Sequence, residues 1–357
     1  MVKKECIVTG LDIGSSKTTA LTARIADDGS FEMLGYASLP SKGVSRGMLA
    51  DLSEATDVVS KTIAKLREKT GKRPGDIYVN ISGQTVKGSK AVGMIPLAVR
   101  GREVMRPDMD RCTGVASTIH LPFDREIIHR IVHDFSIDDQ PWVRNPLGLY
   151  ASRLSCEVYI ITGDVNHIQS IYKCVNLAGY DIKELVYSGI ADGASLLDKA
   201  QKEEGSALID FGDTLTEISI FSAGSLAEFS IIPAGPRDSG ADFKDSPAFG
   251  DTVSALAAKI RDFIAAGGKV SSVVLTGGMV FADGIIEFLE TKLPYPIKMG
   301  TVRDTRGDIS SIDSIRLSTA IGLARYGAEK YMQKIADGAN PAHRLSNKIV
   351  DIFNHYF

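Results

Sequence analysis

Two segments of the chain, residues 6–23 and 207–221, share one layout. Each has an apolar run, an Asp-x-Gly triplet, a polar turn with threonine and a second extended segment; the first reads CIVTGLDIGSSKTTALTA and the second ALIDFGDTLTEISIF. An apolar run that ends in a Gly-containing polar turn is typical of a buried strand that leads into a hairpin. The repeat therefore predicts an internal duplication, with a strand, a turn and a strand at the start of each of two lobes.

A chain of 357 residues is long enough for two or more domains. Hydrophobic residues make up 44% and charged residues 24%, values that argue against wholesale disorder and against an integral membrane protein. The net charge of -3 lacks the basic excess that neutralises phosphates, so we expect no nucleic-acid partner. The cysteines, Cys6, Cys112, Cys156 and Cys174, are widely spaced, which predicts free, buried thiols in a reducing cytosol.

Helical and extended patterns alternate along most of the chain. Apolar spacing predicts helices over residues 57–69, 167–178, 190–202, 253–264, 285–289 and 314–326, and strands over residues 18–25, 76–81, 181–186, 207–211 and 270–275. Short strands and one helix near residues 107–119 predict a small inserted subdomain after Gly83. Residues 233–249 are rich in Gly, Pro, Ser and Asp without periodicity, which predicts a loop.

The first turn, residues 12–19, has the residue types of a phosphate-binding loop. Gly14 permits a positive φ and close backbone approach, so that N–H groups of the turn can face phosphate oxygens. Asp12, at the end of the strand, can hold Mg²⁺ through water. The alternative is a purely structural Gly-Ser hairpin that Asp12 caps. The candidate ligand-binding residues here are Asp12, Gly14, Ser15, Ser16, Lys17 and Thr18.

Two further loops fit the same ligand. The second turn repeats the pattern with Asp210, Gly212 and Thr214, so two turns that face each other would clamp a polyphosphate, with Asp12 and Asp210 as the candidate Mg²⁺ residues. A third apolar strand ends in Gly277, Gly278 and Met279, where a flat base or a ribose can pack against the backbone. Three such motifs in this order are far more specific than one.

This order and spacing of motifs resembles the actin, sugar-kinase and Hsp70 superfamily, in which two phosphate loops and an adenosine loop close over ATP between duplicated lobes. Within it, the chain resembles the FtsA family of bacterial cell-division proteins. The resemblance is carried by SKGVSRGMLADLSEATDVVSKTI at residues 41–63, IYVNISGQTVKG at 77–88, DDQPWVRNPLGLYASRLSCEVYIITG at 138–163, VVLTGGM at 273–279 and STAIGLARYG at 318–327. It implies an α/β, actin-like two-lobed fold with an inserted α+β subdomain IC and a C-terminal amphipathic helix.

The resemblance also implies a division of the chain and a function. Subdomain IA would take residues 1–81 and 164–204, subdomain IC residues 82–163, subdomain IIA residues 205–328, a linker residues 329–340 and the terminal helix residues 341–357. ATP or ADP with Mg²⁺ would bind between the lobes, with at most a weak ATPase activity. The implied partners are the cytoplasmic membrane surface, FtsZ or other division proteins, and further copies of the chain in protofilaments. The implied location is peripheral, on the cytoplasmic face of the cell membrane.

One departure from the family pattern bears on mechanism. In the family a whole subdomain, IIB, lies between the second phosphate loop and the helix before the adenosine loop, whereas here only residues 233 to about 250 are available. The chain is therefore expected to lack most or all of IIB, together with its adenosine-contacting helix, its part of the filament contact and its FtsZ-tail pocket. Asp213 and Thr214 also stand where the family commonly has glycines, and Asp213 would add negative charge near a phosphate.

The last segment, residues 341–357, reads PAHRLSNKIVDIFNHYF. At about 100° per residue its apolar residues fall on one face, with Asn347, Asp351 and Asn354 opposite. This pattern, with flanking cations, predicts a helix that lies on a membrane surface; it is too short and too polar to span a bilayer. The alternative is a helix that docks on its own domain. The predicted membrane-facing residues are Arg344, Leu345, Lys348, Ile349, Ile352, Phe353, Tyr356 and Phe357.

Other patterns carry less. His129 and His133 are four residues apart on a predicted helix and could present two imidazoles to a metal, but the segment reads HRIVH without a carboxylate, which favours a solvated helix face. No Ser/His/Asp or Cys/His arrangement marks a nucleophile. The leading alternative function is an actin-fold scaffold that does not hydrolyse nucleotide, such as a PilM-like pilus-assembly platform. A small-molecule kinase of the same superfamily is a third hypothesis.

Overall fold

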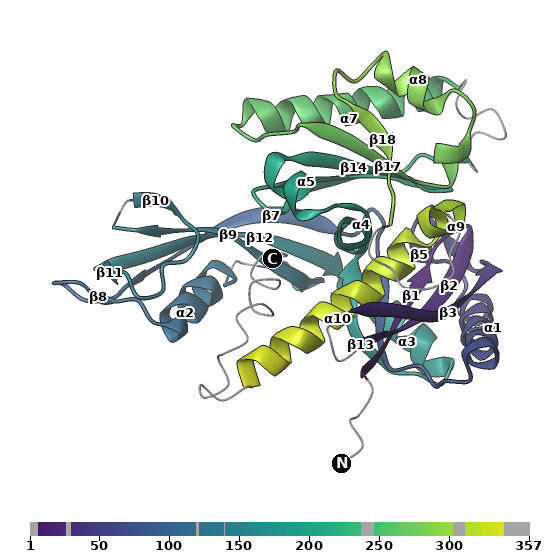
Figure 1. The fold of residues 1–357 in the computed structure, drawn as a ribbon, viewed down its shortest axis with the longest axis horizontal. Coiled ribbons are helices and arrows are strands. Elements are labelled where there is room, and N and C mark those ends of the chain that lie inside the picture. Colours follow the sequence, from purple (N-terminus) through teal and green to yellow (C-terminus); the bar gives the residue numbers. More distant parts are fainter. Residues whose placement is uncertain are drawn as a thin grey trace. The chain divides into compact units, whose positions relative to one another are not determined.

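The computed structural model describes residues 6–25, 30–118, 121–138, 140–236, 246–302 and 311–338. They divide into two compact units: residues 85–166 form unit 2, and the rest of the described chain forms unit 1 (Figure 1). The sequence placed the inserted subdomain at residues 82–163, close to the bounds of unit 2. The terminal helix predicted for residues 341–357 lies outside the described residues and stays a prediction.

The first sheet of unit 1 has five strands in the order β13-β6-β1-β2-β3. β1 forms an antiparallel hairpin with β2, and β6 and β13 run parallel to β1 on its other side. Apolar residues fill the sheet because both of its faces are covered, as the burial of Leu11, Leu21 and Val79 illustrates. The strands are β1 (Cys6–Ile13), β2 (Lys17–Ile25), β3 (Phe31–Pro40), β6 (Asp76–Ile81) and β13 (Ile182–Tyr187).

The second sheet of unit 1 repeats this topology. Its order is β16-β15-β14-β17-β18, with the β14–β15 hairpin in the place of β1–β2 and with β17 and β18 parallel to β14. The repeat in the sequence therefore corresponds to a repeat of the fold. The strands are β14 (Ser206–Phe211), β15 (Thr216–Ser222), β16 (Ser225–Ile232), β17 (Ser272–Gly277) and β18 (Ile297–Met299).

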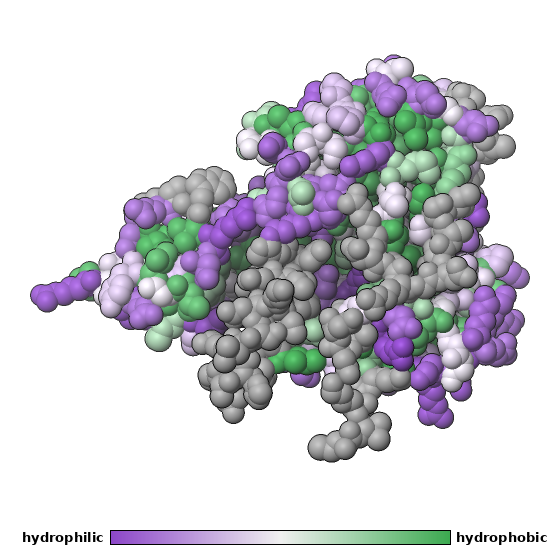
Figure 2. Space-filling model, viewed as in Figure 1, coloured by the Kyte–Doolittle hydropathy of each residue, from purple (hydrophilic) through white to green (hydrophobic). Residues whose placement is uncertain are grey.

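Helices cover the two sheets. α1 begins after Asp51, whose carboxylate accepts a hydrogen bond from the Glu54 N–H at 2.9 Å, and ends at Gly71, which adopts a φ of 64°. Hydrophilic residues lie over the outer side of α1 (Figure 2), whereas its buried side faces β2 and β3. The helices of unit 1 are α1 (Leu52–Thr70), α3 (Val165–Leu177), α4 (Ser188–Leu196), α5 (Lys199–Glu204), α7 (Pro247–Ala265), the 3₁₀ helix η2 (Gly278–Phe281), α8 (Ile285–Glu290), α9 (Ser311–Arg316) and α10 (Ser318–Gly338).

The loop predicted over residues 233–249 is shorter in the structure. β16 ends at Ile232, and α7 begins at Pro247 after the side chain of Ser246 accepts a hydrogen bond from the Phe249 N–H at 3.2 Å. Pro247 suits the first turn of this helix because its missing N–H would have no partner there. Residues 237–245 of the link lie outside the described part of the chain.

α10 packs tightly against both α4 and β1. A Cβ atom on Gly322 would come within 1.8 Å of the Ala191 carbonyl oxygen on α4, and one on Gly10 within 2.1 Å of the Ala320 carbonyl oxygen on α10. The side chain of Tyr326 is buried, and its hydroxyl hydrogen-bonds Glu184 at 2.5 Å. Two glycines thus set how closely the longest helix approaches the rest of unit 1.

The prediction of a polar linker over residues 329–340 is wrong for residues 329–338, because α10 continues to Gly338. Residues 328–336 read AEKYMQKIA, which are mostly strong helix formers, and no glycine or proline interrupts them before Gly338. Polarity suggested a spacer, but helix propensity decides the conformation. None of the described helices is long and apolar enough to cross a membrane.

Unit 2 has a four-stranded antiparallel sheet in the order β10-β9-β12-β7, with α2 packed against β7 and β12. Cys112 of α2 and Cys156 of β12 are buried in its core as free thiols, as is Cys174 in unit 1, whereas Cys6 is half-buried. The elements are β7 (Lys87–Pro96), β8 (Arg102–Glu103), α2 (Arg106–Ala116), β9 (Arg125–Ile137), β10 (Gln140–Val143), β11 (Tyr150–Ala151) and β12 (Arg153–Asp164).

The helix predicted under His129 and His133 is wrong, since both residues lie on strand β9. The β-branched residues around them favour a strand, and β9 pairs with β12 along its length. His129 is buried, and the ring of His133 stacks on Tyr159 with centroids 5.9 Å apart. Within the described ranges, no three His, Cys, Asp or Glu side chains gather as a metal site.

The close packing of α10 yields a first prediction. Gly322→Ala should destabilise the protein by about 1–3 kcal/mol, because the added methyl group overpacks the contact with α4. Gly250→Ala is the matched control: Gly250 is also helical but has open space at its Cβ position, so alanine should stabilise by about 0.5–1 kcal/mol. Urea unfolding of both variants measures the effect, and equal stabilities would contradict this account of the contact.

Candidate functional site

A cavity of about 520 Å³ lies in unit 1 where the turns of the two sheets meet. Its volume falls within the roughly 300–1,000 Å³ that small-molecule sites occupy. All three predicted loops line it, with every predicted binding residue except Thr18. The lining members of that set are Asp12, Gly14, Ser15, Ser16, Lys17, Asp210, Gly212, Thr214, Gly277, Gly278 and Met279.

The turn between β1 and β2 is tight. The Gly14 N–H donates to the Lys17 carbonyl oxygen at 3.1 Å, and a Cβ atom on Gly14 would approach that oxygen to 3.0 Å. The side chain of Asn80, near the end of β6, accepts a hydrogen bond from the Ile13 N–H at 2.7 Å and so fixes the start of the turn to the neighbouring strand. Thr18 is outside the lining because its buried hydroxyl lies 2.8 Å from the Ser41 hydroxyl, which makes it a structural residue.

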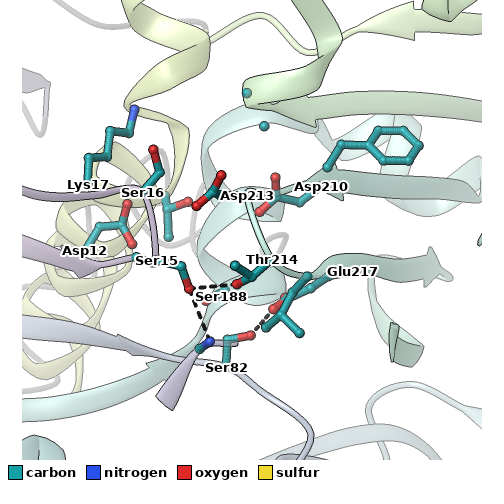
Figure 3. A pocket seen from close by; sticks show the side chains of 18 of the residues that line it. Asp12, Ser15, Ser16, Lys17, Ser82, Ser188, Asp210, Asp213, Thr214 and Glu217 are labelled. Atoms are coloured by element: carbon teal, nitrogen blue, oxygen red, sulfur yellow. Dashed lines mark hydrogen bonds between the residues drawn. The ribbon is translucent and has the colours of Figure 1, made fainter. Parts of the chain in front are cut away.

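The turn between β14 and β15 has the same build. A Cβ atom on Gly212 would come within 2.9 Å of the Leu215 carbonyl oxygen, so glycine fits best here as at Gly14. The two turns touch each other, since the Thr214 hydroxyl donates to the Ser15 hydroxyl at 2.9 Å (Figure 3). A polyphosphate in the cavity would therefore meet backbone and hydroxyl groups of both turns.

Asp12 and Asp210 lie near the ends of corresponding strands, and each residue is half-buried. Burial raises the pKa of Asp12 to about 7; the nearby Lys17 ammonium lowers it, and the charge of Asp210 raises it further. Burial likewise raises the pKa of Asp210 to about 6, against the effect of Lys17. Two carboxyl groups that interact in a buried site are relieved by a divalent cation, and Mg²⁺ takes few carboxylates and keeps waters.

Lys17 is the ammonium group beside these acids. Its Nζ donates a hydrogen bond to the Arg316 carbonyl oxygen, so α9 fixes the side chain at the rim of the cavity. Burial lowers the pKa of Lys17, and Asp12 opposes that change. The same residue can neutralise one carboxylate or one phosphate oxygen.

The third loop follows β17. Gly277 has a φ of 94°, and a Cβ atom there would come within 2.3 Å of Asp210 Oδ1. Gly278 begins η2 and has open space at its Cβ position, while Met279 is buried at the edge of the apolar core of the second sheet. A glycine pair beside an apolar floor leaves a flat surface on which a base or a sugar can lie.

Glu217 is the main site residue that the sequence analysis missed. It is buried and lines the cavity, and its Oε1 accepts a hydrogen bond from the Ser82 hydroxyl (Figure 3). Burial, and then the charges of Asp210 and Asp192, raise the pKa of Glu217 well above its ordinary value. The strand register of the predicted hairpin could have identified Glu217, because this residue pairs directly with Asp210 across the β14–β15 hairpin.

Other lining residues were also missed. They come from turns and helices whose approach to the cavity depends on distant packing: Gly47, Asn80, Ser82, Ser188, Pro236, Ile315, Arg316, Ser318 and Thr319. Asp213, expected to bring negative charge, does line the cavity.

The raised pKa values generate a prediction for the protein without divalent cations. A folded-state pKa above the unfolded value of 3.8 contributes stability that is fully present below about pH 4 and is lost as pH rises through about 6 for Asp210 and about 7 for Asp12. Each unit of pKa difference corresponds to about 1.4 kcal/mol. Asp12→Asn should therefore be more stable than the parent above pH 7, and the gain should shrink on acidification.

Urea unfolding of the parent and Asp12→Asn proteins in chelator across this range measures the difference. Asp57→Asn, at an exposed i,i+4 ion pair with Lys61, is the matched control and should give a small difference that does not grow with pH. Parallel stability curves for the parent and Asp12→Asn would contradict the burial of an ionised Asp12.

With this geometry described, the chain can be compared with known proteins. A family model described as the SHS2 domain inserted in FTSA matches residues 83–162, close to the whole of unit 2. The cell division protein FtsA of Pseudomonas aeruginosa is 27% identical over 389 residues, which cover 93% of this chain and 91% of the relative. The FtsA of Borreliella burgdorferi is 26% identical over 400 residues, which cover 96% and 97%.

Solved structures agree with the fold. A chain of a PilM-PilN type IV pilus biogenesis complex superposes with a TM-score of 0.66 at 14% identity, covering 90% of this chain and 98% of that one. The ethanolamine utilization protein EutJ from Carboxydothermus hydrogenoformans gives a TM-score of 0.51 at 12% identity, covering 90% of each chain. The duplicated sheets, the inserted unit and these relatives together confirm the predicted fold class: the chain is an FtsA-like protein with an actin-like fold.

Proposed function

We propose that this protein is a membrane adaptor of bacterial cell division that binds ATP with Mg²⁺ in the cavity of unit 1 and tethers division proteins to the cytoplasmic face of the membrane. The observation that carries the nucleotide part is the meeting of two Asp-x-Gly turns, from corresponding strands of duplicated sheets, in one cavity of about 520 Å³. The cell-division part rests on similarity to proteins named cell division protein FtsA over more than 90% of this chain.

Each loop would take one part of the nucleotide. Backbone N–H groups and hydroxyls of the two turns would contact the phosphates, through Gly14, Ser15, Ser16, Gly212 and Thr214, with Lys17 as the neutralising cation. Asp12 and Asp210 would hold Mg²⁺ through water, and Gly277, Gly278 and Met279 would contact the adenosine. Bound Mg²⁺ would neutralise phosphate charge beside the carboxylates.

Turnover is proposed to be weak. A general base must be ionised to accept a proton from an attacking water, whereas Glu217 has a strongly raised pKa and accepts a hydrogen bond from Ser82. The nucleotide would then act through the state of the protein that it stabilises rather than through rapid hydrolysis.

A reduced subdomain IIB is part of the proposal. The alignments with FtsA proteins run over 389 and 400 residues, more than the 357 residues of this chain, so the relatives contain segments that it lacks. The link from β16 to α7 is short and is where the missing subdomain would stand. Binding to an FtsZ tail and assembly into protofilaments, both of which involve IIB in the family, stay predictions.

Unit 2 is proposed as the surface for protein partners. It holds many of the large apolar side chains that the described structure exposes, among them Val92 at 69%, Met94 at 52% and Tyr150 at 75%. Exposed apolar side chains of this size favour protein contacts. The family model for this segment supports the same role as the inserted subdomain IC.

A scaffold that binds nucleotide without hydrolysis, such as a pilus-assembly platform, is the second candidate. The observation that favours it is the superposition on a chain of a PilM-PilN complex at a TM-score of 0.66. Phosphate release in the presence of ATP, Mg²⁺ and lipid vesicles separates a slow ATPase from a scaffold. Release at the level of a buffer control would favour the scaffold.

Nucleotide binding can be tested by calorimetric titration with ATP and Mg²⁺. We expect Asp12→Ala to weaken binding at least tenfold, equivalent to about 1.4 kcal/mol, because it removes one of the two half-buried carboxylates proposed to lie beside the cation. Asp57→Ala removes an exposed carboxylate far from the cavity and should bind as the parent does. Absence of binding in the parent, or equal affinity in parent and Asp12→Ala, would refute the nucleotide part.

Membrane attachment can be tested by co-sedimentation with vesicles that contain anionic lipid. The full chain should pellet, and a chain that ends at Gly338 should stay in the supernatant. Phe353→Glu should weaken binding at least tenfold, because burial of a Phe side chain contributes about 1.5–3 kcal/mol and a buried anion opposes insertion.

Asn354→Glu is the matched control, because it adds the same charge on the predicted polar face of the same helix. It should lose much less binding than Phe353→Glu. Equal pelleting of the full and shortened chains, or equal losses in the two glutamate variants, would argue against an anchor with one apolar face.

A further inference from the structure

A two-residue turn formed by Arg46 and Gly47 reaches the cavity from the side of the first sheet. It joins the short strands β4 (Val44–Ser45) and β5 (Met48–Leu49), which pair with each other. Arg46 has a φ of 50° and Gly47 a φ of 71°. A positive φ at both central positions is usual for Asn-Gly or Gly-Gly turns, whereas arginine rarely adopts it. Such an outlier persists only where surrounding contacts hold it.

The contacts of this turn go to both phosphate-loop candidates. The Arg46 N–H donates a hydrogen bond to the Thr214 hydroxyl at 3.1 Å, and the Gly47 N–H donates a longer one to the Ser15 hydroxyl at 3.4 Å. Thr214 in turn donates to Ser15 (Figure 3). Two successive backbone N–H groups therefore point at the place where the loops from the two sheets meet.

The position of the turn is fixed by close packing. A Cβ atom on Gly47 would come within 2.9 Å of the Gly83 nitrogen and within 3.0 Å of Leu215 Cδ1. Gly83, which follows β6, has a φ of 97°, and its own Cβ position lies 3.0 Å from the Arg46 carbonyl oxygen. Gly47 also lines the cavity directly. A side chain at position 47 would push the turn away from the two loops.

The charges around the cavity disfavour an anion unless further hydrogen-bond donors, such as these backbone N–H groups, face it. Four carboxyl groups line it, Asp12, Asp210, Asp213 and Glu217, whereas Lys17 and Arg316 are its cationic lining residues in the described chain. The Lys17 ammonium is already engaged by the Arg316 carbonyl oxygen. Backbone N–H groups in a concave turn attract an anion without the long side chains that a further cation would require.

We infer that the Arg46–Gly47 turn is a third phosphate-binding element, whose two N–H groups bind the terminal phosphate of a nucleoside triphosphate in place of the Ser15 and Thr214 hydroxyls. This inference rests on the proposed nucleotide function and adds a specificity to it. The two hydroxyls would then contact the same phosphate, so the triphosphate would gain donors from both sheets at once. A diphosphate lacks the terminal phosphate, so with a diphosphate bound the N–H groups of the turn would keep their hydrogen bonds to the Thr214 and Ser15 hydroxyls.

The test compares ATP with ADP, each with Mg²⁺, by calorimetric titration of the full chain. Gly47→Ala should weaken ATP binding at least tenfold and ADP binding less than threefold, because its main effect is to displace the turn that binds the terminal phosphate. Gly71→Ala is the matched control: Gly71 has a similar φ of 64° but open space at its Cβ position, far from the cavity. It should change neither affinity by more than twofold.

Arg46→Gly keeps both N–H groups and relieves the unfavourable backbone conformation, so the preference for ATP should be retained. If Gly47→Ala does not fold, nuclear magnetic resonance of the parent protein decides. The amide proton signals of residues 46 and 47 should move downfield with ATP and not with ADP.

The outcomes separate the two levels of the proposal. A parent that binds neither nucleotide overturns the proposed function and this inference with it. Equal losses of ATP and ADP binding in Gly47→Ala, or unmoved amide signals at residues 46 and 47 with ATP, overturn the inference alone and leave the nucleotide site standing.

Discussion

The cavity of unit 1 depends on holding two half-buried carboxyl groups, Asp12 and Asp210, near the ends of corresponding strands. An ionised carboxylate without compensation is costly inside a protein. Here burial raises both pKa values to the range of about 6 to 7, and Lys17 offsets part of the cost. Gly277 leaves room for Asp210, because a side chain there would collide with its Oδ1 at 2.3 Å. The two turns position these carboxyl groups, Gly277 leaves space for one of them, and Lys17 offsets part of their charge.

The same constraint links structure to function. A divalent cation between the two carboxylates would relieve their mutual repulsion, and the same cation would offset the charge of a polyphosphate. Each sheet contributes one aspartate, so a ligand that binds both would couple the two sheets. Glu217, which also lines the cavity, accepts a hydrogen bond from the Ser82 hydroxyl there. These features are consistent with the proposal that the ligand sets a conformational state more than it undergoes rapid chemistry.

The duplicated strand, turn and strand units and the three cavity loops could be predicted from local pattern, whereas the actin-like fold class came from the family resemblance. The Asp-x-Gly repeat predicted the duplication because strand, turn and strand are encoded within a few residues, and the sheets indeed share one strand order. Three features required information that local pattern lacks. Thr18 was assigned to the ligand but bonds Ser41, the histidines of β9 were assigned to a helix but pair with β12, and the polar segment after residue 328 continues α10. Gly47 and Glu217 reach the cavity only through contacts with residues distant in sequence.

Amide hydrogen exchange measured by mass spectrometry, with and without ATP and Mg²⁺, tests most directly whether the two turns close on one nucleotide. The account predicts slower exchange in peptides that cover residues 12–17 and peptides that cover residues 210–215 together, with little change over α1, which lies away from the cavity. Protection of one turn without the other, or of neither at saturating ATP, would contradict the claim that the duplicated loops form a single site.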